Sequence, residues 1–272
     1  MRFLLALALA APAALSAQTE RDDYLAWLAT AANSPFAAVA QQPIGAGLRL
    51  GPATADIPLA GLSEHRVIER GGAVSLEGPG GRALPRGRPV PLGRYTIAVA
   101  GAPGRSVLTV FGRGGERKRA QHYPHDESLV FLGTLAPPAK RTTVRVLAVD
   151  GVETEASEAG TVTVPVGGTR TRLRVLRIPT GDGEESELEI FFRDATNGEG
   201  TYPAGRFVAL VPKAGGRCRL DFNRARNPFC AYSSAYPCPA PWRGNTIPAP
   251  VRAGERYLGG GLTAPPLEGE ER

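Results

Sequence analysis

The 272-residue sequence lacks the motifs by which common enzyme classes are recognised. It has no G-x-S-x-G nucleophile elbow, no H-E-x-x-H zinc helix, no P-loop and no G-x-G-x-x-G after a strand. Only three histidines, His65, His122 and His125, are present to act as imidazole bases. The sequence therefore names no reaction, and we expect no cofactor.

Aromatic residues and long helical periods are also scarce. Aromatics make up 7% of the chain, whereas 34 glycines and 25 prolines favour many turns and short strands over long helices. With 42% hydrophobic and 21% charged residues, the chain is expected to be globular rather than disordered. The net charge of +6 is compatible with an anionic partner, but an average charge says little about any single one.

The N-terminus has the layout of a cleavable export signal. Met1-Arg2 is a short cationic segment, residues 3–15 are apolar, and the small residues Ser16 and Ala17 precede a polar stretch. The apolar run is shorter than the about 20 residues that a transmembrane helix needs, and no cysteine follows it for lipid attachment. No second long apolar segment exists. We expect a signal peptide rather than an N-terminal core helix, and a soluble protein that is periplasmic or secreted.

Export would place the three cysteines in an oxidising compartment, where their odd number allows at most one internal pair. Cys230 and Cys238 are the natural partners because nearby prolines stiffen both approaches, and so short a ring stabilises by only about 2 kcal/mol. Cys218 lies in an alternating, strand-like segment and is expected to be a small buried hydrophobe. Free thiols are an alternative; the C-x7-C spacing is poor for zinc, and there is no C-x-x-C.

The remaining pattern predicts an all-β protein of two linked antiparallel units, of sandwich or small-barrel type, with one N-terminal helix. The helix is expected within residues 19–32, with Thr19 as its cap and Asn33-Ser34-Pro35 at its end. Asp150-Gly151 is a hairpin-turn signal, and arginines alternate with aliphatic residues from 171 to 178 as in a half-buried strand. Strands are expected at 48–50, 64–69, 74–76, 95–99, 107–111, 129–132, 142–149, 160–166, 172–178 and 187–193.

The expected divisions follow the order of the chain. Residues 1–17 form the signal peptide, and residues 18–118 form the helix and the first β unit. Residues 119–260 form the second unit, and residues 261–272 a disordered tail. A basic cluster, Arg113 and Arg117 to Arg119, is expected to be a solvated loop between the units.

Three motifs near the C-terminus are the most distinctive part of the sequence. The first comprises Phe192, Asp194, Thr196, Gly198, Thr201, Tyr202, Gly205, Arg206 and Phe207; the second Leu220 to Asn223, Ala225, Asn227, Pro228, Cys230 and Ala231; the third Cys238, Pro239, Pro241, Asn245 and Arg252 to Glu255. Together they resemble the DUF1684 family of bacterial proteins, over about residues 190–257. The departures from the pattern are Arg226, Phe229, Ala240 and Trp242. The family has no established activity, so the resemblance implies membership rather than a mechanism.

The same motifs hold the candidate ligand-binding residues. Asp221 and Asn223 lie two apart on a strand-like segment, so we expect both on one face. Proline-rich flanks are expected to hold the polar groups on a stiff scaffold, as a small-ligand site requires. The candidates are Asp194, Thr196, Tyr202, Arg206, Asp221, Asn223, Asn227, Tyr232, Asn245, Arg252 and Glu255.

Three functions remain open from the sequence. The first is a binding or accessory module for a small, anionic molecule or a cell-envelope component, because nine Lys and Arg face two acids between residues 202 and 258. Arg206, Arg224 and Arg252 are its candidate donors. The second is a hydrolase-like enzyme with Asp194 or Asp221 as base and arginines stabilising negative charge. The third is a structural role in which acids and arginines brace the fold.

Two other partners are considered and not expected. His122-x-x-His125-Asp126 offers possible metal ligands, but a surface loop is the favoured interpretation, and no metal is expected. Aromatic residues interleaved with basic ones are typical of nucleic-acid binding, which export argues against.

Overall fold

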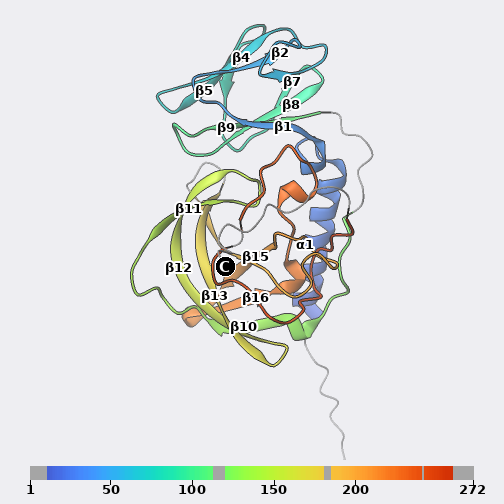
Figure 1. Cartoon of the computed structure of the whole chain (residues 1–272), viewed down its shortest axis with the longest axis vertical. Helices are drawn as coiled ribbons and strands as arrows, with labels where there is room; N and C mark the ends of the chain where they lie inside the picture. Colours follow the sequence, from blue (N-terminus) through green and yellow to red (C-terminus); the bar gives the residue numbers. More distant parts are fainter. Residues whose placement is uncertain (1–10, 113–119, 181–184, 241, 260–272) are drawn as a thin grey trace, which may run out of the picture.

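The computed structural model describes residues 11–112, 120–180, 185–240 and 242–259. The chain is mostly β, with one α-helix among these residues and two β units that lie one above the other in Figure 1. The start of the predicted signal peptide, the basic cluster at 113–119 and the tail from residue 260 lie outside the described residues. No helix in the described ranges is long and apolar enough to cross a membrane.

The helical elements are short apart from α1. They are α1 (Ala11–Thr30), η1 (Pro35–Ala37), η2 (Glu127–Leu129), η3 (Ala214–Gly216), η4 (Phe222–Arg224) and η5 (Phe229–Ala231), where η marks a 3-10 turn. The predicted helix is confirmed, but Thr19 is not its cap, because the helix continues through it from Ala11. The apolar run before Thr19 holds no glycine and only Pro12 near the helix start, so nothing breaks the helix at residue 19.

The upper unit is built from two sheets. Its strands are β1 (Ala38–Pro43), β2 (Leu48–Gly51), β3 (Ile57–Pro58), β4 (His65–Arg70), β5 (Ala73–Glu77), β6 (Arg82–Leu84), β7 (Val90–Leu92), β8 (Tyr95–Ala100) and β9 (Val107–Phe111). One sheet has the order β1-β9-β8-β7 and the other β3-β2-β4-β5-β6, with only β2 and β3 parallel. Leu50 and Val67 of one sheet share a core with Ile97 and Leu108 of the other, as in a sandwich.

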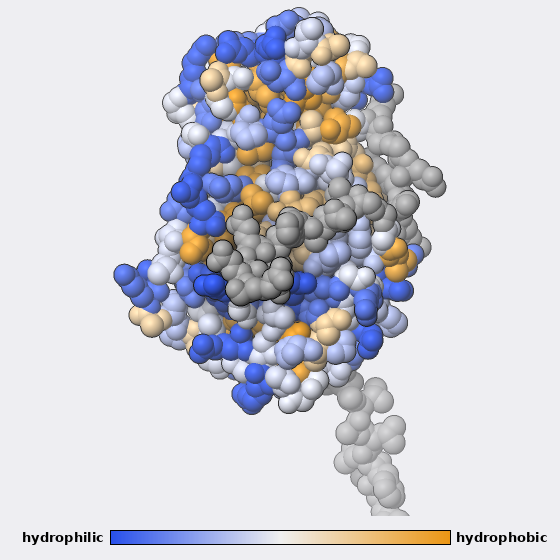
Figure 2. All heavy atoms as spheres, viewed as in Figure 1, coloured by the Kyte–Doolittle hydropathy of each residue, from blue (hydrophilic) through white to orange (hydrophobic). Residues whose placement is uncertain are grey.

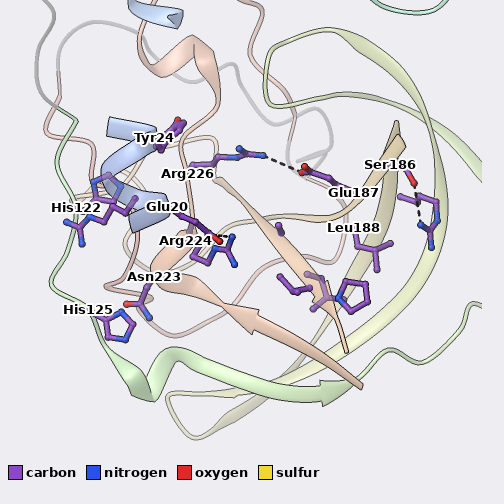
Figure 3. Close-up of a pocket in the computed structure, with 17 residues that line it drawn as sticks. Glu20, Tyr24, His122, His125, Ser186, Glu187, Leu188, Asn223, Arg224 and Arg226 are labelled. Carbon is purple, nitrogen blue, oxygen red and sulfur yellow. Dashed lines mark hydrogen bonds and ion pairs between the residues drawn. The ribbon is translucent and has the colours of Figure 1, made fainter. Parts of the chain in front are cut away.

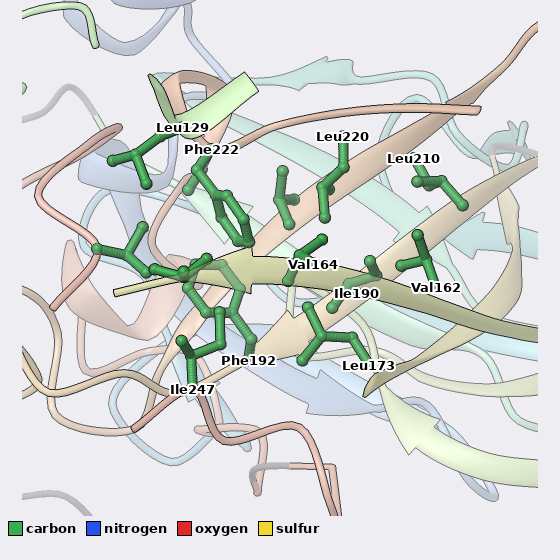
Figure 4. Packing of buried hydrophobic residues seen from close by; sticks show 14 of the residues in the cluster. Leu129, Val162, Val164, Leu173, Ile190, Phe192, Leu210, Leu220, Phe222 and Ile247 are labelled. Atoms are coloured by element: carbon green, nitrogen blue, oxygen red, sulfur yellow. The ribbon is translucent and has the colours of Figure 1, made fainter. Parts of the chain in front are cut away.

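The lower unit, which is the second unit of the sequence, is a single antiparallel sheet. Its strands are β10 (Val130–Thr134), β11 (Thr143–Leu147), β12 (Glu153–Val166), β13 (Thr169–Thr180), β14 (Glu185–Phe192), β15 (Arg206–Pro212) and β16 (Arg217–Asp221), in the order β10-β16-β15-β14-β13-β12-β11. The sheet curves so that Val164, Leu173, Ile190 and Phe192 point into one core (Figure 4). The sheet does not close.

Burial along the strands follows the predicted period. In β13, Leu173 and Val175 are fully buried while Arg172 is exposed, as the predicted alternation requires. From Leu176 onward the pattern changes, because Leu176 and Ile178 are buried in a second cluster on the opposite face of the strand. The hairpin at Gly151 is also confirmed, with Ala148 N–H bonding to the Val152 carbonyl at 3.0 Å. Strands β1, β3, β6, β7 and β15 were not predicted. Strands β3, β6 and β7 hold only two or three residues, and β1 and β15 show no clear alternation of apolar and polar residues.

The helix α1 lies against the lower unit, although the upper unit follows it in the sequence (Figure 1). Trp27 packs on Phe229 with ring centroids 6.0 Å apart, and Glu20 forms an ion pair with Arg224. Leu28 is buried. Helix α1 therefore lies beside the second unit, the chain then forms the first unit, and the residues after it form the second unit. On the face shown in Figure 2, hydrophobic residues lie in small groups between hydrophilic ones.

Candidate functional site

A cavity of about 660 Å³ lies between α1 and the second unit (Figure 3). Its apolar wall comes from the ends of β14 and β15, with Leu188, Ala209 and Val211. The opposite side is formed by Glu20, Arg21 and Tyr24 of α1 and by the segment that contains His122 and His125; Asn223 to Arg226, Arg177, Ser186, Glu187, Leu210 and Pro212 complete the lining. This volume is in the range of small-molecule sites.

The charges around the cavity are mainly positive. Four arginines, at 21, 177, 224 and 226, face the carboxylates of Glu20 and Glu187. Arg224 pairs with Glu20, and Arg226 with the buried Glu189 at 2.9 Å. Within the described ranges, no carboxylate lies at ion-pair distance from Arg21 or Arg177. Arg177 donates one hydrogen bond, to Ser186 Oγ at 3.4 Å, and its other donors and those of Arg21 are available to an anion.

His122 lies at the α1 side of the cavity as a neutral ring. Burial lowers its pKa to about 4, and the nearby Arg21 acts in the same direction. Its Nδ1 is buried without a hydrogen-bond partner. His125, by contrast, is exposed and pairs with Glu127 at 2.9 Å. No group of three or more His, Cys, Asp or Glu side chains suited to a metal ion occurs in the part of the chain that the structure describes.

A buried polar cluster lies behind Tyr24. Oε2 of Glu255 accepts hydrogen bonds from the Asn227 backbone N–H at 2.6 Å and from the Tyr232 hydroxyl at 2.5 Å. The Tyr24 hydroxyl lies beside that of Tyr232 without a well-formed hydrogen bond. Burial raises the pKa of Glu255 to about 7, against the lowering effect of Tyr232, Asn227 and Arg226. The structure thus brings together three predicted site residues, Asn227, Tyr232 and Glu255.

Asp194, Thr196 and Arg206 form a second buried network, which touches Glu255 through its backbone carbonyl. Oδ1 of Asp194 accepts from Thr196 N–H, Thr196 Oγ1 and the Val251 N–H, and Oδ2 accepts from Arg206 Nη2 at 2.9 Å. Arg206 also donates to the carbonyls of Val251, Ala253 and Glu255, and both ion-pair side chains are fully buried. These residues line neither the large cavity nor a smaller one beside Trp242. Their arrangement braces the loop 251–255 against β15.

Asp221 and Asn223 do not share a strand face, so that prediction is wrong. Strand β16 ends at Asp221, and residues 222–224 turn into η4 because Oδ1 of Asp221 accepts the Asn223 N–H at 3.0 Å. Asn223 then bonds through its amide to the backbone of Asp126. Of the predicted ligand-binding residues and anion donors, Asn223 and Arg224 line the large cavity, and the others do not.

The other predicted residues lie apart. Asn245 ties its loop to the backbone of Arg174 and Phe191, and Arg252 is exposed. The Tyr202 hydroxyl is 3.3 Å from Cys230 Sγ and 3.2 Å from Cys238 Sγ. Cys230 and Cys238 do not form a disulfide in this structure, but they lie only 2.7 Å apart.

These thiols differ in their protonation. The contact with Cys230 lowers the pKa of Cys238 to about 6, whereas that contact and burial raise the pKa of Cys230. Cys238 also lines a second cavity of about 450 Å³ beside Trp242 and β11. As predicted, Cys218 is buried in a strand and packs in the core of the second unit.

Sequence reasoning missed most of the large cavity. Tyr24 was predicted only as part of the helix within residues 19–32, and Arg226 was noted only as a departure from a motif. Arg177 was read correctly as an outward residue of its strand. None of these positions carries a local signal of a shared site, because the cavity forms only when α1 packs against a sheet from the other end of the chain.

The protein-family comparison gives a match to the second unit. A family described as "Protein of unknown function (DUF1684)" matches residues 118–256. No curated protein matches the sequence. Among solved structures, an uncharacterised protein from Haloarcula marismortui, determined by solution NMR, is similar, with 27% sequence identity and a TM-score of 0.42. The alignment covers 51% of this chain and 76% of that one.

Proposed function

Because the chain belongs to the DUF1684 family, whose function is unknown, we propose its function from the cavity alone: it binds a small anionic ligand with an apolar body. The observation that carries the proposal is the cavity of about 660 Å³, whose apolar wall faces Arg21 of α1 and is bordered by Arg177, the neighbour of Leu188 in the sheet. Neither arginine has a carboxylate partner among the described residues. An apolar body would lie on Leu188 and Val211. A carboxylate or phosphate group would meet one of these two guanidinium groups.

A hydrolase that uses Asp194 or Asp221 as base finds less support. The Asp194 oxygens are occupied by donors in the second buried network, and Asp221 accepts from Arg219 and Asn223. Neither side chain lines the large cavity. A base must come within hydrogen-bond reach of its substrate, which neither arrangement offers.

We also propose that the mature protein is exported after removal of residues 1–17, and that Cys230 and Cys238 are joined there. The support is the cationic and apolar start of the sequence and the closeness of the two thiols. Cleavage after Ala17 would keep the three α1 residues that line the cavity. Mass spectrometry of unreduced peptides from exported protein should find the two cysteines linked; both alkylated would disprove the link.

The binding proposal is tested by thermal unfolding with ligands that separate charge from apolar surface. Octanoate and octyl phosphate carry both features, inorganic phosphate only the charge, and octanol only the chain. A ligand at about 100 times its Kd adds about 2.7 kcal/mol, which corresponds to a rise in Tm of about 5–10 °C. We expect this rise with the first two probes and little with the others.

Two arginines of the same strand provide the matched variants. Arg177 lines the cavity and Arg172 does not, although both are exposed on β13. Arg177→Gln should weaken octanoate binding about tenfold or more, because a charge-assisted hydrogen bond is worth about 1.5–3 kcal/mol. Arg172→Gln should leave it unchanged. No shift with any probe, or equal effects of the two variants, contradicts the proposal.

A further inference from the structure

Two phenol groups connect the wall of the large cavity to a buried carboxyl group. Tyr24 lines the cavity, while its hydroxyl is buried beside the Tyr232 hydroxyl. Tyr232 in turn donates to Oε2 of Glu255. Glu255 is wholly buried and is thus separated from a bound ligand by the two rings.

Two oxygen atoms in this cluster have no donor. Glu255 Oε1 and Asn227 Oδ1 are both buried without a hydrogen-bond partner in the described part of the chain. They belong to residues in contact, since Asn227 N–H bonds to the other oxygen of the same carboxyl group. An unpaired buried acceptor is costly, and a proton on Oε1 would turn one of the two acceptors into a donor.

The charged and titratable groups around Glu255 come from five elements. They are Tyr24 of α1, His122 of the segment that pairs with residue 255, Arg206 of β15, Arg226 after η4 and Tyr232 after η5. The charge of each arginine is matched by another acid, Asp194 for Arg206 and Glu189 for Arg226. The ring of His122 is neutral at pH 7, because burial holds its pKa at about 4. No group in this set neutralises an ionised Glu255 in full.

We propose that the cavity is a proton-linked site, in which a carboxylate or phosphate ligand seated against Tyr24 binds together with a proton on Glu255. This inference rests on the proposed function and adds the protonation state that it requires. An ionised Glu255 would place a second negative charge behind Tyr24, in an interior where solvent screens it poorly. The protonated carboxyl group removes that repulsion.

The linkage fixes the pH range of the effect. Burial raises the pKa of Glu255 to about 7, so the free protein loses this proton near neutral pH. If the ligand requires the proton, its affinity is constant well below pH 7 and falls up to about tenfold per pH unit above it. Affinity should then be about 30-fold weaker at pH 8.5 than at pH 6, and binding near pH 8 should take up about one proton.

Calorimetry of the full chain with octanoate tests this. Octanoate stays ionised from pH 6 to 8.5, because carboxylic acids titrate near pH 4–5 in water. Titrations at pH 8 in two buffers of different ionisation enthalpy should show the uptake of a proton. Glu255→Gln should abolish both the uptake and the fall in affinity, and His125→Gln should keep them although it removes the exposed histidine at the cavity.

Tyr232→Phe tests the linkage through the pH dependence of binding, because a purely structural role of Tyr232 would not shift that dependence. The hydroxyl that it removes lowers the pKa of Glu255, so the midpoint of the pH dependence should rise. If Glu255→Gln fails to fold, this shift and the proton uptake of the wild type still decide the question. Octanoate binding without pH dependence or proton uptake refutes the linkage alone, as does a pH dependence lost in His125→Gln. No binding at any pH refutes the proposed function itself.

Discussion

Replacing Arg206 by methionine should destabilise the second unit by at least about 4 kcal/mol. Methionine keeps much of the apolar stem against Phe192, whose ring lies 5.3 Å from the guanidinium carbon. It removes the donors to the carboxylate of Asp194 and to the carbonyls of Val251, Ala253 and Glu255. The perturbation therefore leaves one charge and three carbonyl groups in the interior.

The magnitude follows from what is left unpaired. Removing one partner of a buried ion pair costs about 3–5 kcal/mol, because the remaining charge is uncompensated. Each orphaned carbonyl adds about 1 kcal/mol or more unless water reaches it. This is a large part of the about 5–15 kcal/mol by which a domain is stable. In the double variant Arg206→Met with Asp194→Asn no charge is orphaned, so we expect about 2–3 kcal/mol to be recovered.

Urea unfolding followed by tryptophan fluorescence measures this change in the second unit. Both tryptophans report on it, because Trp242 packs on Phe191 and Phe207, and Trp27 on Phe229. The matched control is Arg145→Met on β11, which breaks an exposed ion pair with Glu153 and should cost less than about 1 kcal/mol. If both variants lose the same small amount, Arg206 does not brace the fold and the reasoning from its burial is wrong.

Two further predictions concern Glu255 and a glycine beside it. The pKa of Glu255 is raised from 4.5 to about 7, so its stabilising contribution is present below pH 4.5 and is lost as pH rises to about 7. The wild type should lose about 3 kcal/mol of unfolding free energy over this range. In urea unfolding, Glu255→Gln should not show this loss with pH. Gly254 has φ +72°, and a Cβ there would lie 2.5 Å from the Ala225 carbonyl oxygen, so Gly254→Ala should cost about 3 kcal/mol or more. Gly244→Ala, with φ +86° and no atom within 4 Å, carries only the backbone strain, and equal losses of Tm in the two variants would contradict the steric argument.

The sequence predicted the strands better than the site, because strands follow from neighbouring residues whereas the site depends on residues far apart in the sequence. Residues 172–175 show their inner and outer faces through local alternation, which needs no knowledge of the rest of the chain. Asp221 and Asn223 show the same alternation, but the strand ends between them because the Asp221 carboxylate accepts a hydrogen bond from the Asn223 N–H. Short polar side chains compete with strand pairing in this way, and hydrophobic period alone does not reveal it.

The candidate site depends on contacts between distant segments. Asn227, Tyr232 and Glu255 were predicted from C-terminal motifs, and the structure places them together. Tyr24, their neighbour on the cavity side, comes from the start of the chain. Which face of a helix meets which face of a sheet is decided by packing, so no local pattern marks Tyr24 as part of this cluster.

The position of α1 sets an order on assembly. Synthesis produces the helix first, whereas Trp27 packs against Phe229, which is made almost at the end. The apolar side of the helix therefore stays uncovered until nearly the whole polypeptide has been made, and docking then closes the long loop between residues 27 and 229. A chain that started at residue 118 would hold the whole matched family segment and still leave Phe229 and Tyr232 without this cover. The helix therefore docks late, and the cavity that it lines exists only afterwards.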